Sequence, residues 1–171
     1  MNFDLAFSLW IYNFYFLSDI AQVLSGRLFS GFLVILIGLY FLKIKKFKTF
    51  IFICLITGFG DFLGNMLKDI FSQPRPCFSE FEFFPEIEQC GEDLTGLPSN
   101  HALNFFTFST LLHLTLKNRI ISFIYIMSSI MVALSRVILI KHFLSQVIIG
   151  SVIGITLAII SYKVFKKWIK I

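Results

Sequence analysis

The chain has 171 residues, of which 57% are hydrophobic and only 15% charged, and its mean hydropathy is +0.83. These values exclude an ordinary soluble domain and indicate an integral membrane protein. The length leaves room for one helical bundle, so we expect a single domain over residues 1–171. The net charge of +5 does not indicate nucleic-acid binding, because nearly all of the surplus lies in short runs beside apolar segments.

Five apolar stretches are long enough to cross a bilayer, which takes about 20 residues at 1.5 Å per residue. They are residues 25–42, 49–67, 99–116, 120–140 and 142–162. Residues 3–20 are less uniformly apolar and carry several aromatic side chains, so this stretch either lies at the membrane interface or forms a sixth span. We therefore expect an all-α fold, a polytopic transmembrane helical bundle.

Basic residues at the ends of these stretches predict the orientation. Ten of the fifteen lie in three groups that five spans place on one side, and the positive-inside rule assigns that side to the cytoplasm. The groups are Lys43, Lys45, Lys46 and Lys48; Lys117 and Arg119; and Lys163, Lys166, Lys167 and Lys170. The remaining five basic residues fall at or near the opposite face.

The connection from Asp69 to Leu97 is the one long link between the predicted spans, and it holds seven of the ten acidic residues. Two interpretations are open: a cap over a site, as loops of this length often are, or a solvated acidic connector. Cys77 and Cys90 both lie in this loop, where an oxidising compartment would allow them to form a disulfide. Cys54 falls within a span and is interpreted as a packing residue.

Two cationic side chains flank the start of this loop. Lys68 ends one span, and Arg75 follows seven residues later, with Pro76 fixing the chain direction beyond it. A phosphoryl group needs fixed positive charge, and guanidinium supplies paired planar donors that an ammonium lacks. A lone lysine here would more often be an interfacial residue whose ammonium reaches water, but its neighbours favour phosphate binding.

The segment Pro98-Ser99-Asn100-His101 falls where another span begins, and Ser99 suits the N-cap position. Helix N-termini bind anions through their free N–H groups and the macrodipole. His101 would then lie beside a bound phosphate, where it is a candidate proton donor.

Arg136 lies near the outer end of the fourth span, and His142 opens the fifth. An imidazole that faces a bound phosphate can attack phosphorus and form a phosphohistidine. Gln146 lies four residues after His142, on the same helical face. His113 is about 18 Å along a helix from His101 and is interpreted as structural. No CxxC, HExxH or comparable cluster indicates a metal site.

The ordered pattern Lys-x6-Arg-Pro, Pro-Ser-x-His and Ser-Arg-x5-His-x3 runs from Lys68 to Gln146 and resembles the type 2 phosphatidic acid phosphatase superfamily. The resemblance implies a metal-independent membrane lipid phosphatase without a cofactor. It makes His142 the nucleophile and His101 the acid that protonates the leaving oxygen. The positions that it implies for binding phosphoryl oxygens are Lys68, Arg75, Ser99, the backbone at Asn100, and Arg136.

Two positions depart from the family pattern. Asn100 stands where the family has glycine, and asparagine tolerates unusual backbone angles, so phosphate binding by its N–H can survive. Gln146 stands where an aspartate orients the nucleophilic histidine; its carbonyl can still accept the imidazole N–H, but it adds no negative charge. Another acid, such as the intramembrane Asp61 or one from the loop, would substitute. Asp61 otherwise suits a packing or proton-network role.

The sequence therefore predicts a lipid phosphatase in a bacterial inner membrane, with its active site facing the periplasm. The compact bundle most resembles bacterial lipid A 1-phosphatases, so lipid A 1-phosphate is the expected substrate. Undecaprenyl pyrophosphate and phosphatidylglycerol phosphate are alternatives. A lipid-phosphate-binding protein without turnover is a further alternative, and so is a small transporter subunit, although polar residues concentrated at one end argue against the latter.

Overall fold

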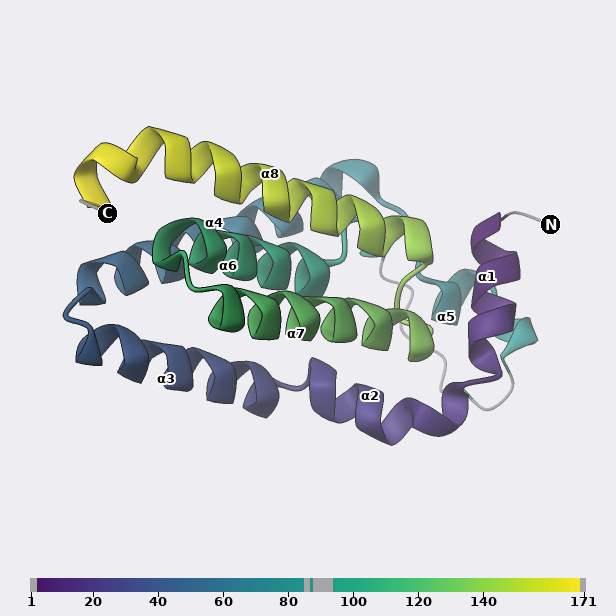
Figure 1. Ribbon diagram of the computed structural model, residues 1–171. Helices are drawn as coiled ribbons and strands as arrows, with labels where there is room; N and C mark the ends of the chain where they lie inside the picture. The colour runs from purple at the N-terminus through teal and green to yellow at the C-terminus, as the bar shows by residue number, and fades with distance from the viewer. Residues whose placement is uncertain (1–2, 85–86, 88–93, 170–171) are drawn as a thin grey trace.

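The computed structural model describes residues 3–84, 87 and 94–169 (Figure 1), and within these residues every regular element is helical. The predicted all-α fold is confirmed. The α-helices are α1 (Phe3–Tyr12), α2 (Ser18–Ser25), α3 (Arg27–Lys43), α4 (Phe47–Phe71), α5 (Pro76–Ser79), α6 (Asn100–Leu116), α7 (Arg119–Ile138) and α8 (Leu144–Ile169). Two 3₁₀ helices, η1 (Tyr15–Leu17) and η2 (Phe81–Phe83), lie between them.

Helix α6 lies at the centre of the bundle. It packs against α8, α7 and α4, while α2 packs on α7 and α3 packs on α4. The long helices run side by side, and α1 crosses one end of the bundle (Figure 1). Large apolar side chains face outward along the long helices, among them Leu28, Leu55 and Ile120. An outer surface of this kind fits lipid rather than water.

Within the part of the chain that the structure describes, three helices are long and apolar enough to cross a membrane: α4, α7 and α8. A fourth crossing is obtained if the segment 15–25 and α3, which meet at a bend of 45°, form one broken span. Helix α6 has 17 residues and is about 25 Å long, a little under the thickness of the hydrocarbon core. The described helices thus follow the five predicted stretches closely, but length and composition support three or four spans.

The sequence suggested that residues 3–20 form one element, but the structure divides this stretch into α1, η1 and the start of α2. Helix α1 ends at Tyr12, and the Asn13 side chain donates a hydrogen bond back to the carbonyl of Trp10 (3.0 Å). Ten residues are too few to cross a bilayer. Helix α1 instead packs on α7 and α8 at the end of the bundle, and the chain then continues through η1 and α2 into α3.

The groups of basic residues lie where the sequence predicted. The α3–α4 turn, the α6–α7 turn and the end of α8 all lie at the same end of the bundle (Figure 1). The ends of α4 and α7 and the start of α8 lie at the other end, together with α1 and α5. The molecule therefore has one lysine-rich end and one end that carries the predicted phosphate-binding residues.

Glycines allow α6 to approach both α4 and α8 closely. A Cβ atom at Gly150 would lie 2.6 Å from the Ser99 carbonyl oxygen, and one at Gly154 would overlap the Leu103 carbonyl. On α4, a Cβ at Gly64 would overlap the side chain of Asn100. Helices in a membrane associate through small residues that let their backbones meet, typically spaced four apart. These contacts place the N-terminus of α6 between α4 and α8.

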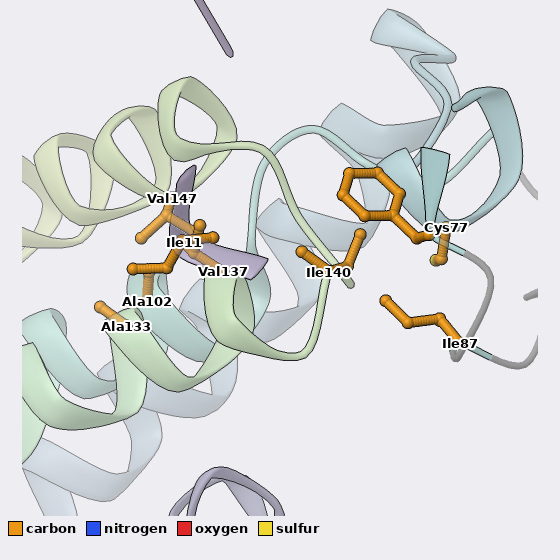
Figure 2. Close-up of a cluster of buried hydrophobic side chains, with 9 residues drawn as sticks. Ile11, Cys77, Ile87, Ala102, Ala133, Val137, Ile140 and Val147 are labelled. Atoms are coloured by element: carbon orange, nitrogen blue, oxygen red, sulfur yellow. The ribbon is translucent and has the colours of Figure 1, made fainter. Parts of the chain in front are cut away.

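The described part of the long loop packs on the bundle. Cys77, Phe84 and Ile87 belong to one buried apolar cluster with Ile11 of α1 and Ile140 of the α7–α8 crossing. Figure 2 shows Cys77 and Ile87 beside Ile140. The backbone N–H of Cys77 also donates to the Ile140 carbonyl (3.2 Å). This supports the interpretation of the loop as a cap more than as a solvated connector.

Cysteine pairing in this loop is described in part. Cys77 is disulfide-bonded, as the sequence predicted, and the proposed partner Cys90 lies outside the described residues. Cys54 is a free, half-buried thiol on α4, in agreement with its interpretation as a packing residue.

Replacing Gly154 by leucine is expected to lower the free energy of unfolding by about 1–3 kcal/mol, because the new side chain has to push α6 and α8 apart. The measurement is thermal unfolding of the purified protein in detergent. Gly58→Leu is the matched control, since no heavy atom lies within 4 Å of a Cβ at Gly58. Equal melting temperatures for the two variants would contradict this account of α6 packing.

Candidate active site

The predicted site residues converge at the end of the bundle opposite the lysine-rich turns. Lys68 lies in the last turn of α4, and Arg136 lies in the last turn of α7. Ser99 and Arg75 are the N-cap residues of α6 and α5. His142 lies in the short crossing between α7 and α8, where its backbone N–H donates to the Arg136 carbonyl (3.2 Å).

The His142 imidazole is held in one tautomer. Its Nδ1 atom lies 2.8 Å from the carbonyl oxygen of Gly96, and the side chain is only 2% exposed. A carbonyl oxygen can only accept a hydrogen bond, so Nδ1 carries the proton and Nε2 carries the lone pair. Nε2 is therefore unprotonated, as a nucleophilic nitrogen has to be.

The surroundings of His142 keep the imidazole neutral. Burial lowers its pKa well below the ordinary value of 6.5, and the charges of Arg136, Arg75 and Lys68 lower the pKa further. The hydrogen bond to Gly96 opposes this shift. All three cations therefore lie near enough to His142 to act on the charge of its imidazole.

The buried donors in this group that make no hydrogen bond to the described residues include the Ser99 hydroxyl and Nε of Arg136. Ser99 is the N-cap residue of α6, as predicted, but its hydroxyl does not cap the helix. Leaving a buried donor without a partner costs about 1–3 kcal/mol. A phosphoryl oxygen would accept from both groups, and the surrounding cations would stabilise its charge.

His101 lies in the first turn of α6 at the same end of the bundle as His142. Lys68 and Arg136 act electrostatically on both imidazoles. The Nε2 atom of His101 lies 3.1 Å from the carbonyl oxygen of Ser25, at the end of α2. By the same reasoning about acceptors, Nε2 carries a proton and donates it to the Ser25 carbonyl.

The side chain of Asn100 points towards α4. Its amide donates to Oδ1 of Asn65 (2.8 Å) and to Oδ1 of Asp61 (3.1 Å). Asn104 donates to the same Asp61 oxygen (2.8 Å). The residue is the first of α6 and is not among those with positive φ, so its tolerance of unusual backbone angles is not what this site uses. The phosphate binding predicted for Asn100 therefore depends on its backbone N–H alone.

Asp61 does not take the place of the family's orienting aspartate. Its carboxylate accepts hydrogen bonds from the amides of Asn100 and Asn104, and Asn65 approaches it at 3.5 Å. The imidazole of His142 bonds to Gly96 instead. Asp61 is therefore part of a polar cluster between α4 and α6. The hydrogen bonds of this cluster offset the free energy that burying a carboxylate within the membrane would cost.

Gln146 does not accept the imidazole N–H, and this expectation was wrong. Its Oε1 atom accepts from the backbone N–H of Phe143 (3.1 Å), and its Nε2 atom donates to the carbonyl of Pro74 (2.9 Å). Helix α8 begins at Leu144, so Gln146 is its third residue and forms the returning half of a capping box. The side chain of Gln146 is therefore hydrogen-bonded both to the start of α8 and to the loop.

Sequence reasoning missed two residues that hold this end of the bundle. Gly96 supplies the acceptor for His142, and a Cβ atom there would overlap the Pro74 carbonyl oxygen. Asp4 of α1 accepts from the backbone N–H (3.0 Å) and the hydroxyl (2.5 Å) of Ser145 in the first turn of α8. Position 143, the N-cap, is phenylalanine, so Asp4 supplies the missing cap from a distance. No local sequence pattern predicts the contact between Asp4 and Ser145.

His113 is exposed in the last turn of α6, away from this group, and its structural role stays a prediction. Among the described residues, no three His, Cys, Asp or Glu side chains lie close enough to hold a metal ion.

A bundle of apolar helices with a cluster of cations and two imidazoles at one end defines this chain as an integral membrane protein. The family model described as the PAP2 superfamily matches residues 49–170. The chain belongs to this superfamily and is a multi-pass membrane protein.

Two solved structures share the fold. One is a PAP2-type phosphatidylglycerolphosphate phosphatase from Bacillus subtilis, with a TM-score of 0.72 and 19% identity over 98% of this chain and 88% of that chain. The other is LpxE from Aquifex aeolicus, with a TM-score of 0.71 and 23% identity over 95% of this chain and 96% of that chain. No curated protein sequence matches the chain.

Lowering the pH is expected to destabilise the protein through His142. The unfolded chain binds a proton on this histidine below pH 6.5, whereas the folded chain resists it, so the free energy of unfolding falls as the pH drops through 6.5. His142→Asn should lose less stability between pH 7.5 and 5.0, as measured by thermal unfolding in detergent without phosphate. His113→Asn serves as the control on an exposed histidine. A parallel loss in the wild type and His142→Asn would contradict the prediction.

Proposed function

We propose that the protein is a phosphatase that removes a phosphoryl group from a membrane lipid, using His142 as the nucleophile. The observation that carries this proposal is the pair of buried, unpartnered donors on Ser99 and Arg136, next to an imidazole held neutral with its lone pair on Nε2. Such a site binds an anion and holds a nucleophile ready at neutral pH.

The reaction proceeds in two displacements. In the first, Nε2 of His142 attacks phosphorus, and the bond from phosphorus to the lipid oxygen breaks. The departing electron pair stays on that oxygen, which takes a proton from the protonated form of His101 and leaves its imidazole neutral. In the second, water attacks the phosphohistidine, gives a proton back to His101 and releases inorganic phosphate. The cations Lys68, Arg75 and Arg136 stabilise the charge on the phosphoryl oxygens throughout.

The substrate that we favour is lipid A 1-phosphate, with undecaprenyl pyrophosphate and phosphatidylglycerol phosphate as alternatives. All three present a phosphoryl group at the membrane surface, which is where a site at the end of an apolar bundle would meet it. We place this end in the periplasm of a bacterial inner membrane, because the lysine-rich turns lie at the other end and the positive-inside rule puts those in the cytoplasm.

A lipid-phosphate-binding protein without turnover is the second candidate. The observation that favours it is Gln146, which supplies no carboxylate to stabilise a positively charged His142. Against it stands the Gly96 carbonyl, which already orients the imidazole.

Release of inorganic phosphate from the three lipids in detergent tests the enzyme. His142→Ala should abolish release, and His101→Ala should slow it by about 10²- to 10⁴-fold, the usual contribution of a general acid. Release should persist with a chelator present. Brief reaction with a ³²P-labelled lipid should leave an acid-labile, base-stable phosphoryl group on the wild type but not on His142→Ala.

His113→Ala is the control for that experiment, because its imidazole is exposed far from the site. Binding of all three lipids without release of phosphate would favour the non-catalytic candidate. Release that survives in His142→Ala would rule out the assigned nucleophile.

The orientation is tested by labelling cysteines in intact cells with a membrane-impermeant maleimide, in a Cys54→Ala background. Glu82 and Lys45 are both exposed and lie at opposite ends of the bundle. Glu82→Cys should react in intact cells, while Lys45→Cys should react only after the inner membrane is opened. The reverse pattern would place the site in the cytoplasm.

A further inference from the structure

Gln146 lies where three segments of the proposed site meet. Its side chain is 1% exposed and contacts the main chain on both sides of the crossing. Oε1 accepts from Phe143, the residue after His142, and Nε2 donates to Pro74, the residue before Arg75. Its own backbone carbonyl accepts from the N–H of Ser99 (3.2 Å). One residue thus touches the neighbours of the nucleophile and of one cation, and the N-cap of α6.

The same contacts lead to the acceptor of the imidazole. The carbonyl of Gln73 accepts the N–H of Gly96 (2.7 Å), and residues 73 and 95 form an isolated parallel bridge. Fixing the Pro74 carbonyl therefore fixes the short segment that presents the Gly96 carbonyl to His142. A Cβ atom built on Gly96 would lie 2.5 Å from Nε2 of Gln146, so the two residues are in direct contact.

We infer that Gln146 is a positioning residue, which holds the Gly96 carbonyl on His142 and keeps Arg75 and Ser99 in register with it. The inference rests on the proposed phosphatase function. According to this inference, an uncharged main-chain carbonyl orients His142. The site then requires the amide of Gln146, and the glutamine is not a less effective substitute for an aspartate.

The chemistry of the two contacts requires an amide. The carbonyl of Pro74 needs a donor, and the N–H of Phe143 needs an acceptor, so one side chain has to supply both. Aspartate is shorter by one methylene and offers two acceptors but no donor. Its carboxylate would therefore repel the Pro74 carbonyl oxygen instead of donating to it. Methionine keeps the volume but offers neither contact.

Gln146→Asp separates this inference from its rival. If glutamine were a weakened substitute for an orienting acid, restoring the acid should raise kcat. If Gln146 positions the segments, Gln146→Asp and Gln146→Met should both lower kcat by about 10- to 100-fold, as small misplacements of reacting groups do. Phosphate release from the same three lipids is the measurement, and Ser151→Ala, which removes a hydroxyl bonded only within α8, is the control.

The pH profile supplies a readout that loss of stability alone would not move. A carboxylate beside His142 would raise its pKa and shift the acidic limb of kcat/KM upward. We expect no upward shift in Gln146→Asp, because the side chain at position 146 contacts the main chain of Phe143 and Pro74 and not the imidazole. Combining Gln146→Met with Gly96→Ala should slow the enzyme no more than the slower single variant, because both changes displace the same carbonyl.

The outcomes are distinguishable. Gln146→Asp with activity equal to or above that of the wild type, or with an upward pH shift, would overturn the inference while leaving the phosphatase in place. No turnover by the wild type on any of the three lipids would instead overturn the proposed function. Melting temperatures of all variants, measured in detergent, identify any that lose activity by unfolding, and Gln146→Glu then takes the place of such a variant, with the same reduction expected.

Discussion

The close approach of α6 to its two neighbours is the constraint on which this end of the molecule depends. Carbonyl oxygens of α6 and of its N-cap lie where side-chain atoms of α8 would otherwise be, and only glycines at positions 150 and 154 leave that room. The hydrogen bond from Ser99 to the Gln146 carbonyl requires this distance. Without it, the segment that begins α6 and the crossing that carries His142 would belong to separate sites.

The electrostatics of the site combine burial with positive charge. Within the described residues, the Asp61 carboxylate accepts hydrogen bonds from the amides of Asn100 and Asn104 on α6. Burial and the charges of Arg136, Arg75 and Lys68 lower the pKa of His142, and this keeps its imidazole unprotonated. An orienting carboxylate would compete with the phosphoryl group for these cations, and an uncharged carbonyl does not.

Much of the fold could be predicted because membrane helices are specified by length and apolar content. The ranges of α3, α4, α6 and α7 agree with the sequence to within a few residues, and the spacing of the cationic and histidine motifs identified which ends meet. The break after Tyr12 was missed because it depends on one asparagine side chain bonding to the preceding turn. The stretch 3–20 is apolar on average on both sides of that break.

The orientation of His142 could not be predicted for a different reason. Sequence spacing places residues four apart on one helical face, which made Gln146 the natural partner. His142 precedes the helix, however, so that spacing does not apply to it. Its partner is a main-chain atom of Gly96, 46 residues away. Every residue has a main-chain carbonyl, so the residue type does not show which carbonyl accepts a hydrogen bond. The second contact of Gln146, with Pro74, is equally distant from any local pattern.

The contact between Asp4 and Ser145 has a consequence for how the protein is made. The first helix caps the last one, across 141 residues of chain. A nascent chain therefore cannot complete the start of α8 until that helix has left the ribosome and met α1 at the membrane surface. During synthesis, the segments that carry Lys68, Arg75 and Arg136 would emerge before the start of α8 is capped.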